Sequence, residues 1–243
     1  MIKERKIIIN TIPTIMIGDD NSNRGLVIFY HGWTSNKDLQ SIRGRILASY
    51  GYRVLMPDCA HHGERGFLDY DAPEAYPLFW QIIMQNIEEG QCLLDYANTN
   101  WGVEPTAVMG HSMGGITAVG LLGAYTQIQL AISLNGSGWW AETNHLMKEN
   151  LDIKGNGILA EVELKIAAQD PLNHPERFIG RSLLALNGGA DDVVSPLAQT
   201  IFIRQLQQIG VDAKQILYPK LGHFLTTNMM GEAVQWLEHK LHK

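Results

Sequence analysis

The stretch "AVMGHSMGGITAVG", from Ala107 to Gly120, places one serine between glycines, with apolar residues on both sides. The apolar run before the serine is typical of a buried strand, and the small residues after it are typical of a helix packed on a sheet. In that context Gly-x-Ser-x-Gly predicts a sharp turn that exposes a serine hydroxyl at the edge of the sheet. Ser112 is therefore a candidate nucleophile, and a glycine-rich packing turn is the alternative.

Apolar runs and helical patterns alternate along the rest of the chain. Runs without polar alternation are typical of strands buried on both faces, as in a parallel sheet. We expect strands at residues 26–30, 53–57, 106–110, 130–135, 182–187 and 214–219. Helical patterns occur at residues 39–51, 79–98, 112–125, 196–210 and 229–243. This alternation predicts an α/β doubly wound fold, with a mostly parallel sheet and a single domain spanning residues 1–243.

Two segments depart from this alternation. Residues 6–20, "KIIINTIPTIMIGDD", are expected to form an antiparallel hairpin at the edge of the sheet. Residues 136–181 contain no clear strand and lie between two predicted core strands. We expect a small, mostly helical cap insertion there, over the edge of the sheet where ligands bind in this architecture. A second independent domain is the alternative, but about 45 residues would make a thin core.

A serine nucleophile needs a base to accept its proton, and the base needs an acid to orient it. In an arrangement of this kind the acid and the histidine follow the serine along the chain. Asp191 follows one predicted strand, in "GGADDVV", and His223 follows the next, in "KLGHF". Because loops after parallel strands converge on one edge of a sheet, we expect Ser112, Asp191 and His223 to meet there. Asp192 is the alternative acid.

Acyl transfer also needs backbone N–H groups that bind the oxyanion. We expect the first from Met113, directly after the candidate nucleophile. The second is expected from Trp33, because "FYHGWTSNK" follows an early strand and Gly32 permits a tight turn. We expect His31 to brace this loop rather than to take part in the chemistry.

The stretch "CAHHGERG" contains metal-ligand residue types in His61, His62 and Glu64. Adjacent histidines do not readily face one centre, and no matching cluster occurs elsewhere in the sequence. We therefore expect no metal, and a loop that borders the active-site cleft. His111, directly before the candidate nucleophile, is expected to pack beneath the turn.

Two adjacent tryptophans, Trp139 and Trp140, begin the segment expected to be an insertion. Aromatic side chains are common in ligand sites, so both residues are candidates for a substrate pocket. The alternative is that they anchor the insertion to the body of the protein, and the sequence does not decide between the two.

The composition excludes several classes of partner. The 243 residues are 45% hydrophobic and 18% charged, as in a soluble globular protein, and the net charge of −6 argues against nucleic-acid binding. No apolar run approaches the roughly 18 residues of a membrane span, and no signal-peptide pattern is present. Cys59 and Cys92 are expected to be free thiols, which is typical of a reducing compartment, so we expect a cytoplasmic protein. The lack of a long apolar run leads us to expect no membrane partner. Nothing in the sequence indicates an oligomeric state.

Together these motifs resemble the α/β-hydrolase superfamily. They are "HGW" at 31–33, "GHSMGG" at 110–115, "GGADDVV" at 188–194 and "GH" at 222–223. More narrowly, the chain is similar to small bacterial esterases related to the prolyl-oligopeptidase and dienelactone-hydrolase branches. The resemblance implies a Ser–His–Asp hydrolase that needs no metal or organic cofactor. It also implies Ser112, Asp191 and His223 as the triad, with Trp33 and Met113 as oxyanion donors.

The sequence departs from the pattern of this family at the end of the acid-bearing strand. Relatives often have His-Gly at the end of the acid-bearing strand, whereas this chain has Asn187 and Gly188. We expect this difference to change how the loop is braced and not which residue is the acid. A dienelactone hydrolase usually has a cysteine nucleophile where this chain has Ser112, which argues against that activity.

These observations favour a serine hydrolase, and most specifically a carboxylesterase that cleaves small to medium acyl esters of small molecules through an acyl-enzyme. One alternative is a serine peptidase of the prolyl-oligopeptidase type. An alternative of another class is a non-catalytic ligand-binding protein, because a fold does not by itself fix a function.

Overall fold

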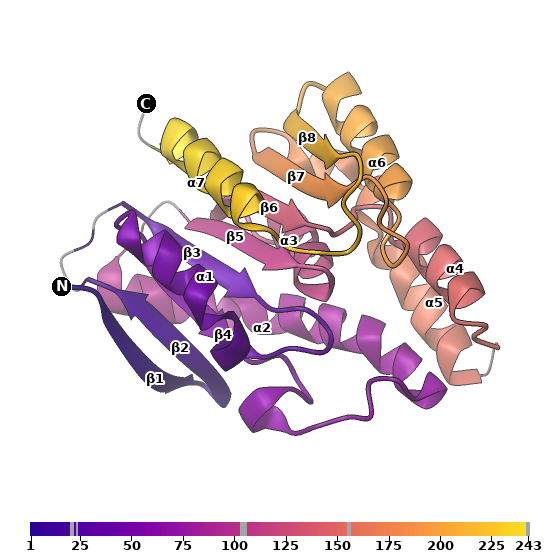
Figure 1. The fold of residues 1–243 in the computed structure, drawn as a ribbon, viewed down its shortest axis with the longest axis horizontal. Coiled ribbons are helices and arrows are strands. Elements are labelled where there is room, and N and C mark those ends of the chain that lie inside the picture. The colour runs from indigo at the N-terminus through magenta and orange to yellow at the C-terminus, as the bar shows by residue number, and fades with distance from the viewer. Residues whose placement is uncertain (20–21, 23, 103–105, 155–156, 242–243) are drawn as a thin grey trace.

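The computed structural model describes residues 1–19, 22, 24–102, 106–154 and 157–241. These residues form an eight-stranded sheet with the strand order β1-β2-β4-β3-β5-β6-β7-β8 (Figure 1). The strands are β1 (Lys3–Ile9), β2 (Ile12–Gly18), β3 (Leu26–Tyr30), β4 (Arg53–Pro57), β5 (Thr106–His111), β6 (Ile128–Leu134), β7 (Ser182–Gly188) and β8 (Asp212–Tyr218). The strands from β4 to β8 in this order pair in parallel, which confirms the predicted sheet.

The first two strands form the antiparallel edge hairpin that the sequence predicts. β1 pairs with β2 through a turn at Asn10 and Thr11, both of which have positive φ. Such two-residue turns match the twist of hairpin strands. β2 then pairs antiparallel with β4, so the hairpin extends the parallel sheet on one side.

The helices follow the predicted pattern, with shifts of a few residues at their ends. In the described residues they are α1 (Lys37–Ser49), α2 (Tyr76–Trp101), α3 (Met113–Ala124), α4 (Trp140–Asn150), α5 (Gly157–Gln169), α6 (Pro196–Gln208) and α7 (Thr227–Leu241). α2 is longer than predicted because Pro77 is compatible with a first helical turn. It ends at Trp101, and Gly102 follows with a positive φ, as suits a glycine after a helix.

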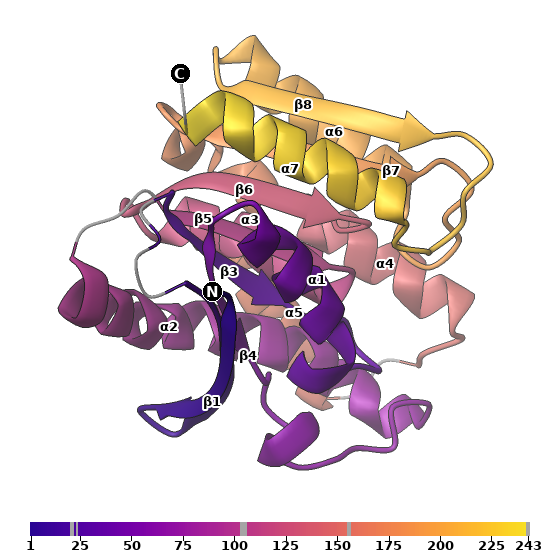
Figure 2. The same cartoon turned by 60° about the vertical axis from the view of Figure 1, so that its left-hand side comes forward.

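Helices cover both faces of the sheet and divide the core into two parts. Along β3, Leu26, Ile28 and Tyr30 point toward the core shared with α2, α3 and α6. Val27 and Phe29 point toward the core shared with α1 and α7. Because helices cover the sheet on both faces (Figures 1 and 2), both faces of this strand are buried and it is a continuous apolar run.

The segment at 136–181 contains α4, α5 and two short 3₁₀ turns, at Pro171–Asn173 and Pro175–Phe178. α4 and α5 contact each other and lie together at one end of the sheet (Figure 1). The buried side chains of α5 belong to the core that also contains α2. In the part of the chain that the structure describes, no helix combines the length and hydrophobicity needed to cross a bilayer.

Candidate active site

Ser112 lies on the turn between β5 and α3, in a backbone conformation that few residues other than glycine adopt. Its φ and ψ are 56° and −119°. Its own N–H donates to Leu134 O at 2.8 Å, and its carbonyl accepts from Ile116 N at 3.0 Å. A strained non-glycine residue held by its neighbours is typical of a functional site.

Two glycines allow this turn to form. A Cβ atom on Gly110 would lie 2.3 Å from the carbonyl oxygen of Gly114. A Cβ on Gly114 would lie 2.2 Å from the carbonyl oxygen of Tyr30 on the neighbouring strand. Both distances are far below contact, so strand and helix approach this closely only because the two positions lack side chains.

The structure brings together Ser112, His223 and Asp191. His223 Nε2 lies 2.8 Å from Ser112 Oγ, and His223 Nδ1 lies 2.7 Å from Asp191 Oδ2. With Nδ1 protonated, His223 donates to the carboxylate and accepts the serine hydroxyl proton at Nε2. The Asp191 side chain is fully buried, whereas 17% of the His223 side chain is exposed. A hydroxyl, an imidazole and a carboxylate therefore form one continuous chain of hydrogen bonds.

Of the two adjacent acids, Asp191 is the one that reaches His223. Its second carboxylate oxygen, Oδ1, accepts from Val193 N and Val194 N, both at 2.9 Å. These bonds fix the orientation of the carboxylate, because one oxygen is held by the backbone while the other faces the histidine. Asp192 is exposed to solvent.

The segments that carry Met113 and Trp33 adjoin Ser112. Met113 is the first residue of α3, so its N–H has no acceptor within the helix. A Cβ on Gly32 would lie 3.5 Å from Ser112 Cβ, which places the turn before Trp33 beside the serine. A helix N-terminus and a nearby turn of this kind can supply N–H groups to a developing oxyanion.

Two buried histidines brace the turn at Gly32. His31 Nε2 accepts from Cys59 N at 3.1 Å, and its Nδ1 lies 2.8 Å from Gly32 O. Burial lowers the pKa of His31 to about 4, so the ring is neutral at neutral pH. The ring of His62 bonds to the carbonyl oxygen of Trp33 and lies 2.8 Å from that of Ala60. The stretch "CAHHGERG" thus supports the turn, and the described residues contain no group of three metal-ligand side chains.

His111 packs against His223, with 5.1 Å between the ring centroids. Burial, and then the charges of His223 and Arg43, lower the pKa of His111 to about 3. His111 is therefore a neutral ring beside the hydrogen-bonded chain. The Nδ2 atom of Asn135 lies 3.4 Å from His111 Nε2. Asn135 was not among the predicted site residues, because the predicted strand at 130–135 included it, whereas β6 ends at Leu134.

The side chains of Trp139 and Trp140 lie in different environments in the structure. Trp140 is 1% exposed, packs 6.0 Å from Trp80 between ring centroids, and belongs to the core with α2 and α3. This packing favours the anchoring alternative for Trp140. Trp139 is partly exposed and precedes the first residue of α4. Asp170 fixes this helix start by accepting from Trp140 N and Ala141 N.

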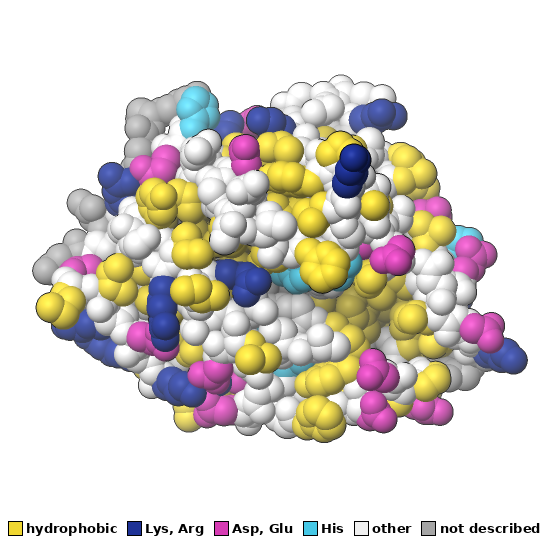
Figure 3. Space-filling model, in the orientation of Figure 1, with side chains coloured by type: hydrophobic (Ala, Val, Ile, Leu, Met, Phe, Trp, Pro, Cys, Tyr) yellow, Lys and Arg dark blue, Asp and Glu magenta, His cyan; other side chains and the backbone are white. Residues whose placement is uncertain are grey.

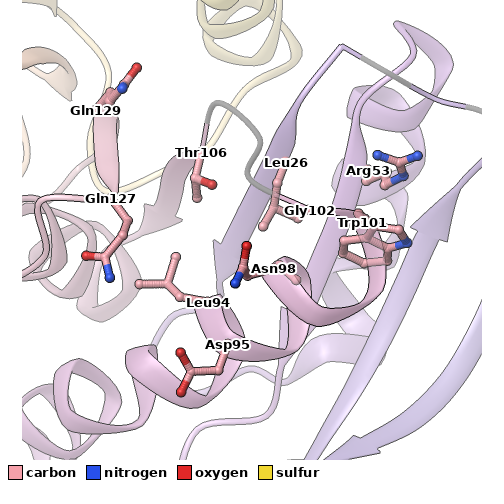
Figure 4. A pocket seen from close by; sticks show the side chains of 11 residues that line it. Leu26, Arg53, Leu94, Asp95, Asn98, Trp101, Gly102, Thr106, Gln127 and Gln129 are labelled. Carbon is pink, nitrogen blue, oxygen red and sulfur yellow. The ribbon is translucent and has the colours of Figure 1, made fainter.

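Figure 3 shows a hollow near the middle of one face, over the carboxyl ends of the central strands, with histidine and hydrophobic side chains along its border. A separate cavity of about 410 Å³ lies elsewhere (Figure 4). Its walls include Leu26 and Thr106, the first residues of β3 and β5. It therefore opens at the amino ends of the strands, opposite the edge that carries Ser112.

A strained serine turn, a histidine and a buried aspartate each follow their own strand of a mostly parallel sheet, which is the arrangement of serine hydrolases of the α/β type. Two family models match the chain. The one described as "Serine aminopeptidase, S33" matches residues 21–156, and the one described as "Prolyl oligopeptidase family" matches residues 97–242. The chain belongs to the α/β-hydrolase superfamily that these serine hydrolase families represent.

Curated relatives match most of the chain. It is 31% identical over 237 residues to the esterase YjfP of Escherichia coli, covering 93% of this chain and 92% of that protein. It is 32% identical over 215 residues to the putative esterase YitV of Bacillus subtilis, covering 82% of each.

Solved structures share the fold at lower identity. TT1662 from Thermus thermophilus superposes with a TM-score of 0.84 at 20% identity, covering 100% of this chain and 99% of that one. The acylaminoacyl peptidase of Pyrococcus horikoshii superposes with a TM-score of 0.74 at 17% identity. That match covers 100% of this chain but 42% of the peptidase.

Proposed function

We propose that the chain is a carboxylesterase that cleaves small to medium acyl esters of small molecules. The observation that carries the proposal is the continuous hydrogen-bonded chain from Ser112 through His223 to Asp191 at the ligand-binding edge of the sheet. The esterase names of the curated relatives YjfP and YitV support the choice of esters. In this proposal no cofactor is required, because the three side chains supply the nucleophile, base and acid.

The proposed reaction begins when His223 Nε2 accepts the Ser112 hydroxyl proton as Oγ attacks the ester carbonyl carbon. Asp191 holds the ring and stabilises the imidazolium that forms. The N–H groups of Trp33 and Met113 bind the oxyanion. His223 then gives its proton to the leaving alkoxide, and an acyl-serine remains. Water, deprotonated by His223, then attacks the acyl-serine. The bond between the acyl carbon and Ser112 Oγ breaks, His223 returns its proton to Oγ, and the carboxylic acid leaves.

The test is hydrolysis of p-nitrophenyl esters from acetyl to decanoyl by the wild type and by Ser112→Ala. Loss of the nucleophile should lower kcat by on the order of 10⁴ or more. Ser195→Ala is the matched control. The Ser195 side chain makes no capping bond to α6, so this substitution should leave kcat unchanged. Equal rates for Ser112→Ala and wild type would show that Ser112 is only a packing residue.

A serine peptidase is the second candidate, favoured by the match of residues 97–242 to the prolyl oligopeptidase family model. Aminoacyl p-nitroanilides measured beside the matching esters separate the two activities. Because p-nitrophenyl esters are intrinsically more reactive than anilides, anilide cleavage that is lost in Ser112→Ala would overturn the esterase proposal, and cleavage of the esters alone would support it. Covalent labelling by a fluorophosphonate separates either enzyme from a non-catalytic binding protein, which would not be labelled at Ser112.

The proposal extends to two further features. We propose that α4 and α5 form a cap that shapes the acyl pocket, supported by their place between β6 and β7 in the chain. We also propose a cytoplasmic location, supported by the free thiols of Cys59 and Cys92, neither of which is in a disulfide.

A further inference from the structure

Asn135 occupies the centre of the edge that carries the proposed triad. Ser112 follows β5, Asp191 follows β7 and His223 follows β8, and Asn135 is the residue directly after β6. Because β6 lies between β5 and β7 in the sheet, Asn135 lies between the serine turn and the acid loop. Its side chain is completely buried.

The side chain of Asn135 bonds to the loops on both sides. Its Oδ1 accepts from Gly188 N at 2.9 Å, where the acid loop leaves β7. Its Nδ2 donates to Phe224 O at 3.0 Å, one residue beyond His223. The same Nδ2 lies 3.4 Å from Nε2 of His111, one residue before Ser112. One amide thus contacts the segments that carry all three proposed catalytic residues.

The backbone of Asn135 is itself fixed. Its N–H donates to Leu186 O at 2.8 Å, and its φ is 48°. Asparagine, aspartate and glycine are the residues that adopt this left-handed region with least cost. Of these three, asparagine alone offers a donor and an acceptor at once. The positive φ and the two side-chain hydrogen bonds therefore both favour asparagine at this position.

The bond to Phe224 O matters because the side chain of Phe224 does not anchor the His223 loop. That ring is 70% exposed. The backbone carbonyl of Phe224 therefore holds this part of the loop to the body of the protein, beside the packing of Leu221 and Leu225 against the core. A shift there moves His223, which has to keep both the 2.8 Å contact to Ser112 and the 2.7 Å contact to Asp191.

We propose that Asn135 is a positioning residue for catalysis, which holds the His223 loop and the acid loop in register with Ser112. This inference rests on the proposed serine hydrolase function. The amide touches no reacting atom, and it acts through the backbone at Gly188 and Phe224. Misplacement of a catalytic group by about 1 Å can lower a rate by roughly 100-fold, so small shifts at these two bonds are sufficient.

Two substitutions at Asn135 test the proposal without adding backbone strain. Asn135→Asp keeps an acceptor for Gly188 N and removes the donor to Phe224 O, whereas Asn135→Gly removes both. Asn86→Asp is the matched control. It changes another buried asparagine, whose Nδ2 lies 3.3 Å from Cys59 Sγ and 3.4 Å from Thr117 Oγ1, in the core shared with α2.

The readouts are kcat and KM on p-nitrophenyl esters, the rate of fluorophosphonate labelling of Ser112, and the melting temperature. Both Asn135 variants should lower kcat and the labelling rate by roughly 10- to 100-fold, with KM within about threefold of wild type. Asn86→Asp should lower the melting temperature comparably and leave kcat within about threefold of wild type. A merely structural role for Asn135 would lower the melting temperature alone.

The outcomes separate this proposal from the proposed function. Folded Asn135 variants with wild-type kcat and labelling rate would overturn the positioning role while leaving the esterase intact. A wild type that is labelled but cleaves no ester would overturn the esterase proposal, and the labelling rates would still decide the role of Asn135. If Asn135→Gly does not fold, Asn135→Asp decides, because it retains the bond to Gly188.

Discussion

At the residue scale, the acid of the proposed triad is chosen by the backbone around it. The sequence offers Asp191 and Asp192 side by side, and their chemistry is identical. The difference is that Val193 N and Val194 N both hold Oδ1 of Asp191, which turns Oδ2 toward His223. The position of the turn, and not the residue type, decides which carboxylate orients the histidine.

A pair of matched substitutions tests this choice. Asp191→Asn keeps the shape of the side chain but places an amide against the histidine and favours the wrong tautomer. It should lower kcat on p-nitrophenyl acetate by on the order of 10³ to 10⁴. Asp192→Asn changes an exposed side chain and should leave kcat within about twofold of wild type. The reverse pattern of rates would identify Asp192 as the acid.

At the scale of the element, a buried ion pair fixes the start of α1. Lys37 Nζ donates to Asp58 Oδ2 at 2.7 Å and to Glu64 Oε1 at 2.6 Å. The side chains of Lys37 and Asp58 are both completely buried. Burial opposes the charge of Lys37, but these hydrogen bonds outweigh it and raise its pKa above the ordinary value. The pair joins the helix that follows the turn at Trp33 to the loop after β4.

Lys37→Met should therefore destabilise the protein strongly, because it leaves Asp58 buried without its cation. We expect a loss of about 3 to 5 kcal/mol in the free energy of unfolding, measured by urea denaturation. Lys6→Met is the control, since Lys6 pairs with Asp38 at 2.7 Å and is 60% exposed. That change should cost at most about 1 kcal/mol. Equal losses would show that burial does not distinguish the two pairs.

The elements were predictable from the sequence to different degrees, for physical reasons. The run at 26–30 predicts a strand because both of its faces are buried, which is a local pattern. The meeting of Ser112, Asp191 and His223 at one edge of the sheet was predictable because each follows its own strand. The bond between Lys37 and Asp58, and the contacts of Asn135 with Gly188 and Phe224, join residues far apart in the chain. The spacing of apolar residues along the sequence does not predict such contacts, because they depend on how the loops pack.

At the scale of the whole molecule, three buried histidines make the fold sensitive to acid. Burial lowers the pKa of His31 to about 4, that of His111 to about 3, and also that of His62. Between pH 6.5 and about 4, His31 and His111 are protonated in the unfolded chain but neutral in the folded protein. The unfolded state then binds more protons, so the free energy of unfolding decreases as the pH falls.

His31 allows this prediction to be tested at one site. Its Nε2 already accepts from Cys59 N, so a proton there would face another donor. A shift from about 6.5 to about 4 corresponds to about 3 kcal/mol of stability, present above pH 6.5 and lost progressively toward pH 4. His31→Gln retains an acceptor and cannot titrate. Urea unfolding at half-unit steps from pH 7 to pH 4.5 should give this variant a lower stability at pH 7 and a shallower decline. Parallel declines for the variant and wild type would show that His31 takes up its proton equally in both states, and that the acid sensitivity lies with other groups.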